Sequence, residues 1–418
     1  MISYNKASII LKKNKIKFKN EIISSKDSFN RVASKNIKSP NNYPAENNTA
    51  FDGFAINSKE TIKINKNNSK KFKIIKTLAA GDNPTIRKVP KLSTIEVMTG
   101  AIIKKPFDTI IPIENIKFFP NKFNPKHIII DKRIKKNNHI RPKGSDYKKG
   151  KIIIKKGQIV KSSHILAFKT LGIQKILVKK RPKIIFFTTG NEISNNNKIP
   201  NWKIRNSNNH YLKSFLKNFS IDFKEKKILK DNHENKFKTE IKKFLNSNAE
   251  LIITSGAISA GKFDFVPKII KQFKIKKFFK GVAIRPGKPV MFAKFKKNKC
   301  FFGLPGNPIS SAACFRFFVL PYLFHSLGLK NDISINAKIK NKFVKKKQFT
   351  RFIKGRISFS KKSSVKFEIL KGQESYKISS FVNSNAWGVF PSGKEIFKKG
   401  DYIKCFTLSG INELLLSN

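Results

Sequence analysis

The segment 181-RPKIIFFTTGNEI-193 decides the fold, because a compact apolar run in it ends in a glycine-containing loop. The same plan recurs where 251-LII-253 precedes 254-TSGA-257 and where 300-CFF-302 precedes 303-GLPGNP-308. Short apolar runs bounded by such loops are typical of buried parallel strands. Helix-compatible patterns at 208–218 and 232–245 separate the first two units. The sequence therefore predicts an α/β multidomain protein with a doubly wound α/β domain over residues 181–329.

Outward from this domain, the pattern changes in both directions. Short apolar runs alternate with Gly and Pro from about 70 to 160, which predicts a β-rich domain over residues 41–149. Residues 1–40 and 150–180 are expected to form a linker or helical domain, in which 164–179 reads as a helix that stops near Gly172 and then a strand. After Asn331 short strands and turns return, so residues 330–418 are expected to form a small β-barrel-like domain.

Composition restricts the class of protein. Hydrophobic residues make up 39% of the 418 positions, which is enough to build folded cores. The 89 Lys and Arg against 25 Asp and Glu give a net charge of +64, but the excess is spread along the chain rather than clustered as in specific nucleic-acid recognition. Three cysteines without metal or disulfide spacing favour a reduced, cytoplasmic protein. No segment resembles a signal peptide or a membrane span, so we expect no membrane partner.

The three glycine-containing loops lie beyond the carboxyl ends of the predicted strands, where ligands bind in open parallel sheets. Glycines let backbone N–H groups approach an anion, and Asn307 and Pro308 would start a helix whose positive end faces the same crevice. An ordinary strand-to-helix turn is the alternative. The loops thus predict a phosphate-bearing or oxyanionic ligand, bound by Thr189, Gly190, Ser255, Gly256, Ser259, Gly261, Gly303, Pro305, Gly306, Asn307 and Pro308.

Charged side chains near these loops suggest two further features. Glu192 follows the first loop, Asp231 follows the strand-like segment 227–229, and Asp264 follows the second loop. Such carboxylates, completed by water and substrate phosphates, can hold Mg²⁺, although each could also be an acid that favours a helix N-terminus. Arg285 and Lys288 stand in the stiff frame 285-RPGKP-289, which lowers the entropy cost of gripping an anion.

Three other motifs are turn-like when taken alone: 48-NTAFDGF-54, which contains Asp52, 98-MTGA-101, which contains Thr99, and 144-GSD-146, which contains Asp146. Together with the loops above, however, they make seven ordered motifs along nearly the full chain. In this order and spacing, the sequence resembles the MoeA and gephyrin E-domain family of molybdopterin molybdenumtransferases.

The resemblance implies an L-shaped homodimer of four-domain subunits, with the active site between the α/β domain of one subunit and the β-rich domain of its partner. It also implies a reaction, in which molybdate enters adenylylated molybdopterin, Mg²⁺ assists and AMP leaves. The adenylyltransferase and molybdoenzymes would be protein partners. The family's functional residues fall on Asp52, Thr99, Asp146, Glu192, Asp231, Asp264, Arg285, Lys288, Pro305, Pro308 and Ser375.

Some positions depart from the family pattern: Ala257 replaces a glycine, and Asn191 and Asn206 stand where relatives often carry Asp. Three alternatives to the insertase remain at this point. A molybdopterin adenylyltransferase would share the fold of residues 181–329, a pterin-binding scaffold would keep the fold without catalysis, and a nucleic-acid binder would use the charge of +64.

Overall fold

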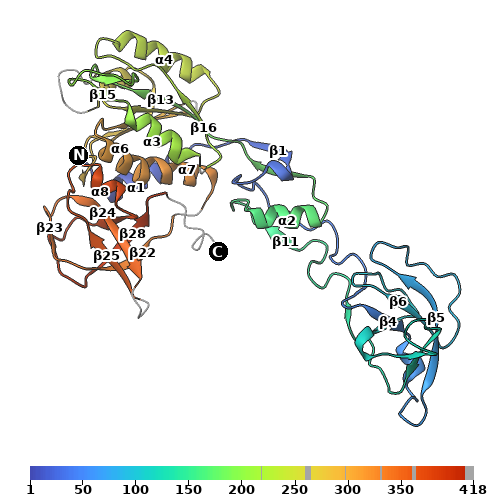
Figure 1. Ribbon diagram of the computed structural model, residues 1–418. Helices are drawn as coiled ribbons and strands as arrows, with labels where there is room; N and C mark the ends of the chain where they lie inside the picture. Colours follow the sequence, from blue (N-terminus) through green and yellow to red (C-terminus); the bar gives the residue numbers. More distant parts are fainter. Residues whose placement is uncertain (218, 259–264, 297, 330–331, 360–363, 410–418) are drawn as a thin grey trace.

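The structure is a computed structural model that describes residues 1–217, 219–258, 265–296, 298–329, 332–359 and 364–409. The chain is elongated and bent (Figure 1). An α/β domain and a C-terminal barrel lie together at one end, and a β-rich domain lies at the other end beyond a slender linker (Figure 1). Among the helices of the described residues, none is both long and apolar enough to cross a bilayer.

The α/β domain contains a six-stranded sheet in the order β16-β13-β17-β21-β20-β18. The first four strands are parallel, as the repeated apolar runs predict, and β20 is antiparallel to both of its neighbours. The elements of this domain are β13 (Lys183–Thr188), β14 (Ile193–Ser194), β15 (Ile204–Arg205), α3 (Ser207–Leu216), β16 (Asp222–Glu225), α4 (Glu234–Asn246), β17 (Leu251–Ser255), α5 (Val266–Lys271), β18 (Ile275–Lys280), β19 (Ile284–Arg285), β20 (Met291–Phe295), β21 (Cys300–Leu304), α6 (Pro308–Cys314), the π-helix η4 (Phe315–Val319) and α7 (Leu320–Leu327).

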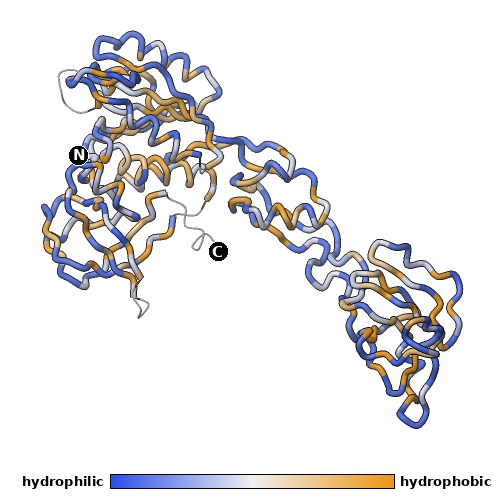
Figure 2. The backbone as a smooth tube through the Cα atoms, in the orientation of Figure 1, coloured by the Kyte–Doolittle hydropathy of each residue, from blue (hydrophilic) through white to orange (hydrophobic). Residues whose placement is uncertain are grey.

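Helices cover both faces of this sheet, which confirms the doubly wound prediction. Helices α3, α6 and α7 pack with side chains such as Phe186 and Phe302 in one core, and α4 and α5 pack with Phe187 and Phe301 in a second core. Successive residues of a strand point to opposite faces, so the apolar runs can fill both cores. In Figure 2 hydrophobic residues gather in the region of α7, whereas most residues of α4 are hydrophilic.

Two sequence expectations need correction or refinement. The segment 227–229 is not a strand of the sheet, because the strand before α4 is β16 and only Leu229 makes an isolated bridge, to Thr189. Leu229 is buried in the core beneath α4, which accounts for its apolar side chain. The N-terminal lead-in contains α1 (Tyr4–Lys13), whose Ala7 and Leu11 pack in the same core as α3, α6 and α7.

The C-terminal domain is a closed five-stranded barrel, as the strand pattern predicted. Strands β24, β25, β22, β28 and β26 are paired in that order, and β26 pairs back to β24. Strand β19 of the α/β domain adds in parallel to β24, with Arg285 opposite Arg351, and so joins the two domains. The elements are β22 (Ile335–Ile339), β23 (Phe343–Val344), β24 (Thr350–Phe359), β25 (Val365–Ile369), α8 (Ser379–Val382), β26 (Ala386–Phe390), β27 (Ile396–Phe397) and β28 (Tyr402–Thr407).

The other two parts are mostly β-structure. The linker contains β1 (Asn20–Ser24), β2 (Ile37–Lys38), β11 (Ile152–Ile154), α2 (Ser162–Thr170) and β12 (Lys175–Lys179). The β-rich domain holds a six-stranded sheet in the order β7-β4-β6-β5-β9-β8 and a short β3–β10 pair. Its strands are β3 (Asn48–Thr49), β4 (Gly53–Ile56), β5 (Lys70–Leu78), β6 (Ser93–Val97), β7 (Thr109–Pro112), β8 (Lys117–Phe119), β9 (His127–Ile130) and β10 (Ile140–Arg141).

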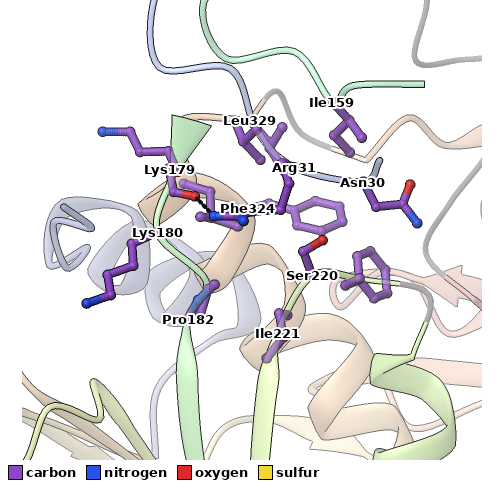
Figure 3. A pocket seen from close by; sticks show the side chains of 13 residues that line it. Asn30, Arg31, Ile159, Lys179, Lys180, Pro182, Ser220, Ile221, Phe324 and Leu329 are labelled. Atoms are coloured by element: carbon purple, nitrogen blue, oxygen red, sulfur yellow. Dashed lines mark hydrogen bonds between the residues drawn. The ribbon is translucent and has the colours of Figure 1, made fainter. Parts of the chain in front are cut away.

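The linker meets the α/β domain around a small pocket (Figure 3). Arg31 of the linker is buried there and donates a hydrogen bond of 2.7 Å to the carbonyl of Lys179, and it also pairs with Glu21. Phe324 of α7 lines the same pocket from the α/β side (Figure 3). Arg31, Glu21 and Lys179 all belong to the linker, so these contacts order the face of the linker that meets the α/β domain.

Candidate functional site

The three predicted loops lie side by side at the carboxyl edge of the parallel strands. The N–H of Thr189 donates to the carbonyl of Ser255 at 2.9 Å, and the N–H of Gly256 donates to the carbonyl of Leu304 at 2.9 Å. These bonds run from the first loop to the second and from the second to the third. The convergence expected from the sheet topology is therefore present in the part of each loop that the structure describes.

The second loop approaches the first so closely that a side chain does not fit. Gly256 has a φ of +99°, and a Cβ there would lie 2.6 Å from the backbone oxygen of Thr189. The next residue, Ala257, has a φ of +51°, in the left-handed region that favours glycine. This chain thus keeps the left-handed backbone without the family's second glycine, at a cost of about 1–2 kcal/mol.

Asn208 on α3 ties the second loop to the third. Its side-chain amide donates to Ser255 Oγ at 2.6 Å and to the carbonyl of Gly306 at 2.7 Å, and the residue is 8% exposed. A buried donor pair of this kind fixes the separation of two loops. Nothing in the sequence distinguishes Asn208 from the many other asparagines, so sequence reasoning missed it.

We predict that Asn208→Ala raises the KM for the loop-bound substrate by about tenfold and leaves kcat within about threefold. The substitution leaves the buried Ser255 hydroxyl and the Gly306 carbonyl without their donor, which costs roughly 1–3 kcal/mol. Steady-state kinetics with the full-length enzyme measures this split. His210→Ala, an exposed change on the same helix, is the matched control. An unaltered KM in Asn208→Ala would show that the loops hold their places without it.

The neighbouring Asn206 explains one departure from the family pattern. Its Oδ1 accepts a hydrogen bond of 2.8 Å from the Thr188 hydroxyl, while its Nδ2 donates to Asn195 Oδ1 at 2.9 Å. An amide makes both contacts, whereas a carboxylate has no N–H to donate. The asparagine therefore suits the side chains around it in this chain.

The third loop carries the start of α6. Asn307 is the N-cap by position and Pro308 the first helical residue, but the Asn307 amide donates to Ser375 Oγ at 3.1 Å rather than capping the helix. This contact joins the α/β domain to the C-terminal barrel. The carbonyl of Pro305 accepts from Ser255 Oγ at 3.4 Å, while Gly303 lies buried within β21 against Ile258.

A cleft of about 640 Å³ lies where these two domains meet. Arg285, Lys288, Ser310, Arg351 and Ser375 line it, so the predicted cations and the predicted serine do come together. The sequence analysis did not identify Arg351 as a site residue. A single arginine in so basic a chain does not stand out until the pairing of β19 with β24 places it opposite Arg285. Arg285 lies over the ring of Phe349 at 4.9 Å and faces Arg351, whose pKa is lowered by burial and by the Arg285 charge. The cleft lining sets Arg285, Lys288 and Arg351 against one carboxylate, that of Glu374, and this excess of cations favours an anionic ligand.

The barrel side of the cleft is shaped by a loop that Lys354 holds. The Lys354 ammonium group is almost completely buried and donates to the carbonyls of Gly372, Glu374 and Lys377 at 2.7, 3.2 and 2.9 Å. Ser375 lies within this loop. Burial lowers the pKa of Lys354 to about 8, although the negative charge of Glu374 acts to raise it.

We predict that oxyanion affinity in the cleft falls by about three- to tenfold as the pH rises from 7 to 9. Below its pKa of about 8 the ammonium group donates three hydrogen bonds, whereas the neutral amine has two N–H groups and leaves one loop carbonyl unsatisfied. Titration calorimetry with molybdate at several pH values measures the affinity. Lys354→Arg stays charged throughout and should flatten the profile. An equally steep profile in Lys354→Arg would assign the titration to another group.

Glu192 and Asp231 lie on adjacent segments. The N–H of Gly190 donates to the carbonyl of Leu229 at 3.0 Å, and the N–H of Asp231 donates to Asn191 Oδ1 at 3.2 Å. The Lys230 ammonium group bonds the carbonyl of Ile193 at 3.3 Å and thereby fastens the two segments together. Within the described residues no group of three or more His, Cys, Asp or Glu side chains is placed to hold a metal. Ser259, Gly261 and Asp264, which were also predicted for this site, lie outside the described residues.

Asp52 and Thr99 form a second, separate cluster in the β-rich domain. Both the backbone N–H and the hydroxyl of Thr99 donate to Asp52 Oδ1, at 2.5 and 2.8 Å, and these bonds lower the pKa of the exposed carboxyl. Asp146 is exposed on another loop of the same domain. Figure 1 shows this domain at the far end of the chain from the α/β sheet, so one chain does not bring all predicted site residues together.

The fold and these loops define a class of protein, that of molybdopterin-binding α/β enzymes with added β domains. Residues 2–172 match the MoeA N-terminal region (domains I and II), residues 185–325 a probable molybdopterin binding domain, and residues 336–408 the MoeA C-terminal region (domain IV). These three regions follow one another along almost the whole sequence. The chain belongs to the MoeA family, as its motifs indicated.

Individual relatives agree with this assignment. The chain is 29% identical to the molybdopterin molybdenumtransferase of Staphylococcus epidermidis over 96% of this chain and 94% of that protein. It is 28% identical to the enzyme of the same name from Staphylococcus aureus, over 93% and 92% of the two chains. A crystal structure described as the molybdopterin biosynthesis MoeA protein of Pyrococcus horikoshii shares the fold with a TM-score of 0.82 at 24% identity, covering 98% of this chain and 99% of that one.

Proposed function

We propose that this MoeA-family protein is a molybdenum insertase, a transferase that places molybdate onto adenylylated molybdopterin, releases AMP and completes the molybdenum cofactor. The observation that carries the proposal is the order of the loops along the sheet. The acidic segments lie beside the end of β13, the second and third glycine-containing loops follow β17 and β21, and the cationic cleft lies next to β20. These features therefore form a row along the edge of the sheet. Such a row fits an elongated ligand with an anion at one end and a phosphoanhydride further along.

The spacing of this row suits the proposed substrate. Neighbouring strands lie about 4.8 Å apart, so the three steps from β13 to β20 span roughly 14 Å. An extended ligand with its pterin at one end and its adenylyl group at the other would lie along this row and reach past β13. Its pterin end, which receives molybdate, belongs at the cleft of Arg285, Lys288 and Arg351, because the dianion needs cations there.

The opposite end of the row is proposed to act on the phosphoanhydride. Glu192, Asp231 and Asp264 would hold Mg²⁺, which supplies charge neutralisation at the phosphates when it is bound. Two carboxylates on segments fastened to each other fit a cation that keeps several of its waters and takes the remaining ligands from substrate. The third loop and the start of the helix at Pro308 present backbone N–H groups to the same ligand.

The exposed Asp52–Thr99 pair is proposed to complete the site of a second subunit. Its carboxyl is held in one orientation by two hydrogen bonds, and its domain lies at the far end of the chain from the α/β domain (Figure 1). A homodimer in which the β-rich domain of one subunit covers the crevice of the other would use this pair. The alternative adenylyltransferase is not favoured, because the cationic cleft needs the C-terminal barrel as well as the α/β domain.

Cofactor formation tests the proposal. Purified protein, adenylylated molybdopterin, molybdate and Mg²⁺ are incubated, and the product is transferred to a molybdenum-free molybdoenzyme whose activity is then assayed. The insertase should restore activity in proportion to the product formed. Omitting molybdate should abolish the signal. Binding of the adenylylated pterin without any restored activity would identify a pterin-binding scaffold instead.

A further inference from the structure

Trp202 is an exposed aromatic side chain beside the acidic segments. Its fractional exposure is 76%, whereas the chain's other tryptophan, Trp387, is fully buried. Leaving an indole in water forfeits one of the largest apolar contributions a side chain can make. An indole that stands in water on a well-fixed turn is therefore a candidate contact for a planar ligand.

The turn that carries Trp202 is held by its neighbours. The N–H of Lys203 donates to the carbonyl of Pro200 at 3.0 Å, which makes Trp202 the third residue of a four-residue turn. The Lys203 ammonium group donates to the carbonyl of Asn191 at 2.5 Å, and the N–H of Ile204 donates to the carbonyl of Glu192 at 2.8 Å. The residue after Trp202 and the next one thus both bond directly to the segment that carries Glu192.

These bonds place Trp202 close to the segment that carries Glu192. Trp202 is two residues from Ile204, at most about 7 Å along the backbone, and Ile204 pairs with Ile193 across the short β14–β15 ladder. The turn lies on the β13 side of the row, at the opposite end from the cationic cleft. Arg205 on the same ladder is exposed and adds a positive charge near the turn.

We propose that Trp202 is the stacking platform for the purine base of the adenylyl group. The inference rests on the proposed function for the direction of the ligand: with the pterin and molybdate at Arg285 and Lys288, the adenylyl group extends past Glu192 and Asp231 toward the turn. A base stacks on an aromatic ring whatever its hydrogen-bonding edge, and one such contact changes affinity by about ten- to hundredfold. The same subsite would hold AMP after the phosphoanhydride bond is broken.

Tryptophan fluorescence of the full-length protein tests this assignment directly. Trp387 is buried, so the solvent-exposed part of the emission reports Trp202. Titration with AMP in the presence of Mg²⁺ should quench that emission, and ribose 5-phosphate, which lacks the base, should not. Trp202→Ala should raise the Kd for AMP, measured by calorimetry, by at least about tenfold. Trp202→Phe should restore most of the affinity, and Tyr402→Ala, an exposed aromatic change on the barrel, should leave it unaltered.

The outcomes separate this proposal from the insertase function. AMP binding that is equally tight in Trp202→Ala, or no quenching by AMP in the parent protein, would overturn the stacking platform. Quenching that depends on Trp202, in a protein that releases no AMP on addition of molybdate, would keep the base subsite and remove the insertase function. Release of AMP that continues at the parental KM in Trp202→Ala would keep the insertase function and remove the base subsite.

Discussion

Glu192→Gln is expected to lower the rate of molybdate-dependent AMP release by roughly 10²–10³-fold. The substitution keeps the shape of the side chain and removes its negative charge. Glu192 lies beside Asp231 on segments joined by the Asn191–Asp231 and Lys230–Ile193 hydrogen bonds, so the backbone around it should not change. The lost charge would weaken Mg²⁺ binding, and the metal concentration needed for half-maximal rate should rise as well.

Two comparisons make this result specific. Glu234→Gln changes an acid at the start of α4 that has no proposed part in the site, and its rate should stay within about twofold of the parent. Thermal unfolding of Glu192→Gln should match the parent, because an exposed acid contributes little to stability. A normal rate and a normal metal requirement in Glu192→Gln would remove this residue from the reaction.

Mixed dimers of Asp52→Ala and Glu192→Gln are expected to regain activity that neither variant has alone. If each site takes Asp52 from one subunit and Glu192 from the other, a mixed dimer carries one doubly substituted site and one intact site. Random mixing makes about half of the dimers mixed, so total activity should reach about one quarter of the parent. Co-expression with two affinity tags allows the mixed dimers to be purified, and these should reach about one half.

The same experiment can contradict the shared site. If each subunit carried a complete site, both subunits of the mixed dimer would be damaged and its activity would not exceed that of the two variants. A mixture of Asp231→Ala with Glu192→Gln is the matched control, because both residues lie in one α/β domain and neighbour each other. In that mixed dimer one site has the Asp231→Ala change and the other site has the Glu192→Gln change. Neither site is intact, so the purified mixed dimers should stay inactive.

Residue patterns predicted the α/β domain well. The apolar runs at 184–187, 251–253 and 300–302 fall within the parallel strands β13, β17 and β21, since a strand buried on both faces must be apolar along its length. The segment 227–229 was misread because an isolated buried leucine with an apolar neighbour looks the same as a short strand. Its backbone runs beside the end of β13, where the N–H of Leu229 donates to the carbonyl of Thr188 at 2.9 Å, but it forms only an isolated bridge and no regular strand.

The candidate site was predicted only in part, because much of it depends on contacts between distant segments. Arg351 enters the cleft through the pairing of β19 with β24, and Lys354 acts through three carbonyls of another loop. Neither residue has a local sequence signal. Glycines were better predictors of the site. Gly256 has a φ of +99° and lies so close to Thr189 that no side chain fits, so the second loop requires a glycine at this position.

Release of AMP from adenylylated molybdopterin by the purified, full-length protein tests the insertase function most directly. AMP is quantified by chromatography with molybdate and Mg²⁺ together, with each alone and with neither. We expect rapid release only when both are present, with one AMP formed for each molybdenum incorporated. Release that does not respond to molybdate, or tight binding of the adenylylated pterin with no release under any condition, would contradict the assignment of this MoeA-family chain as a molybdenum insertase.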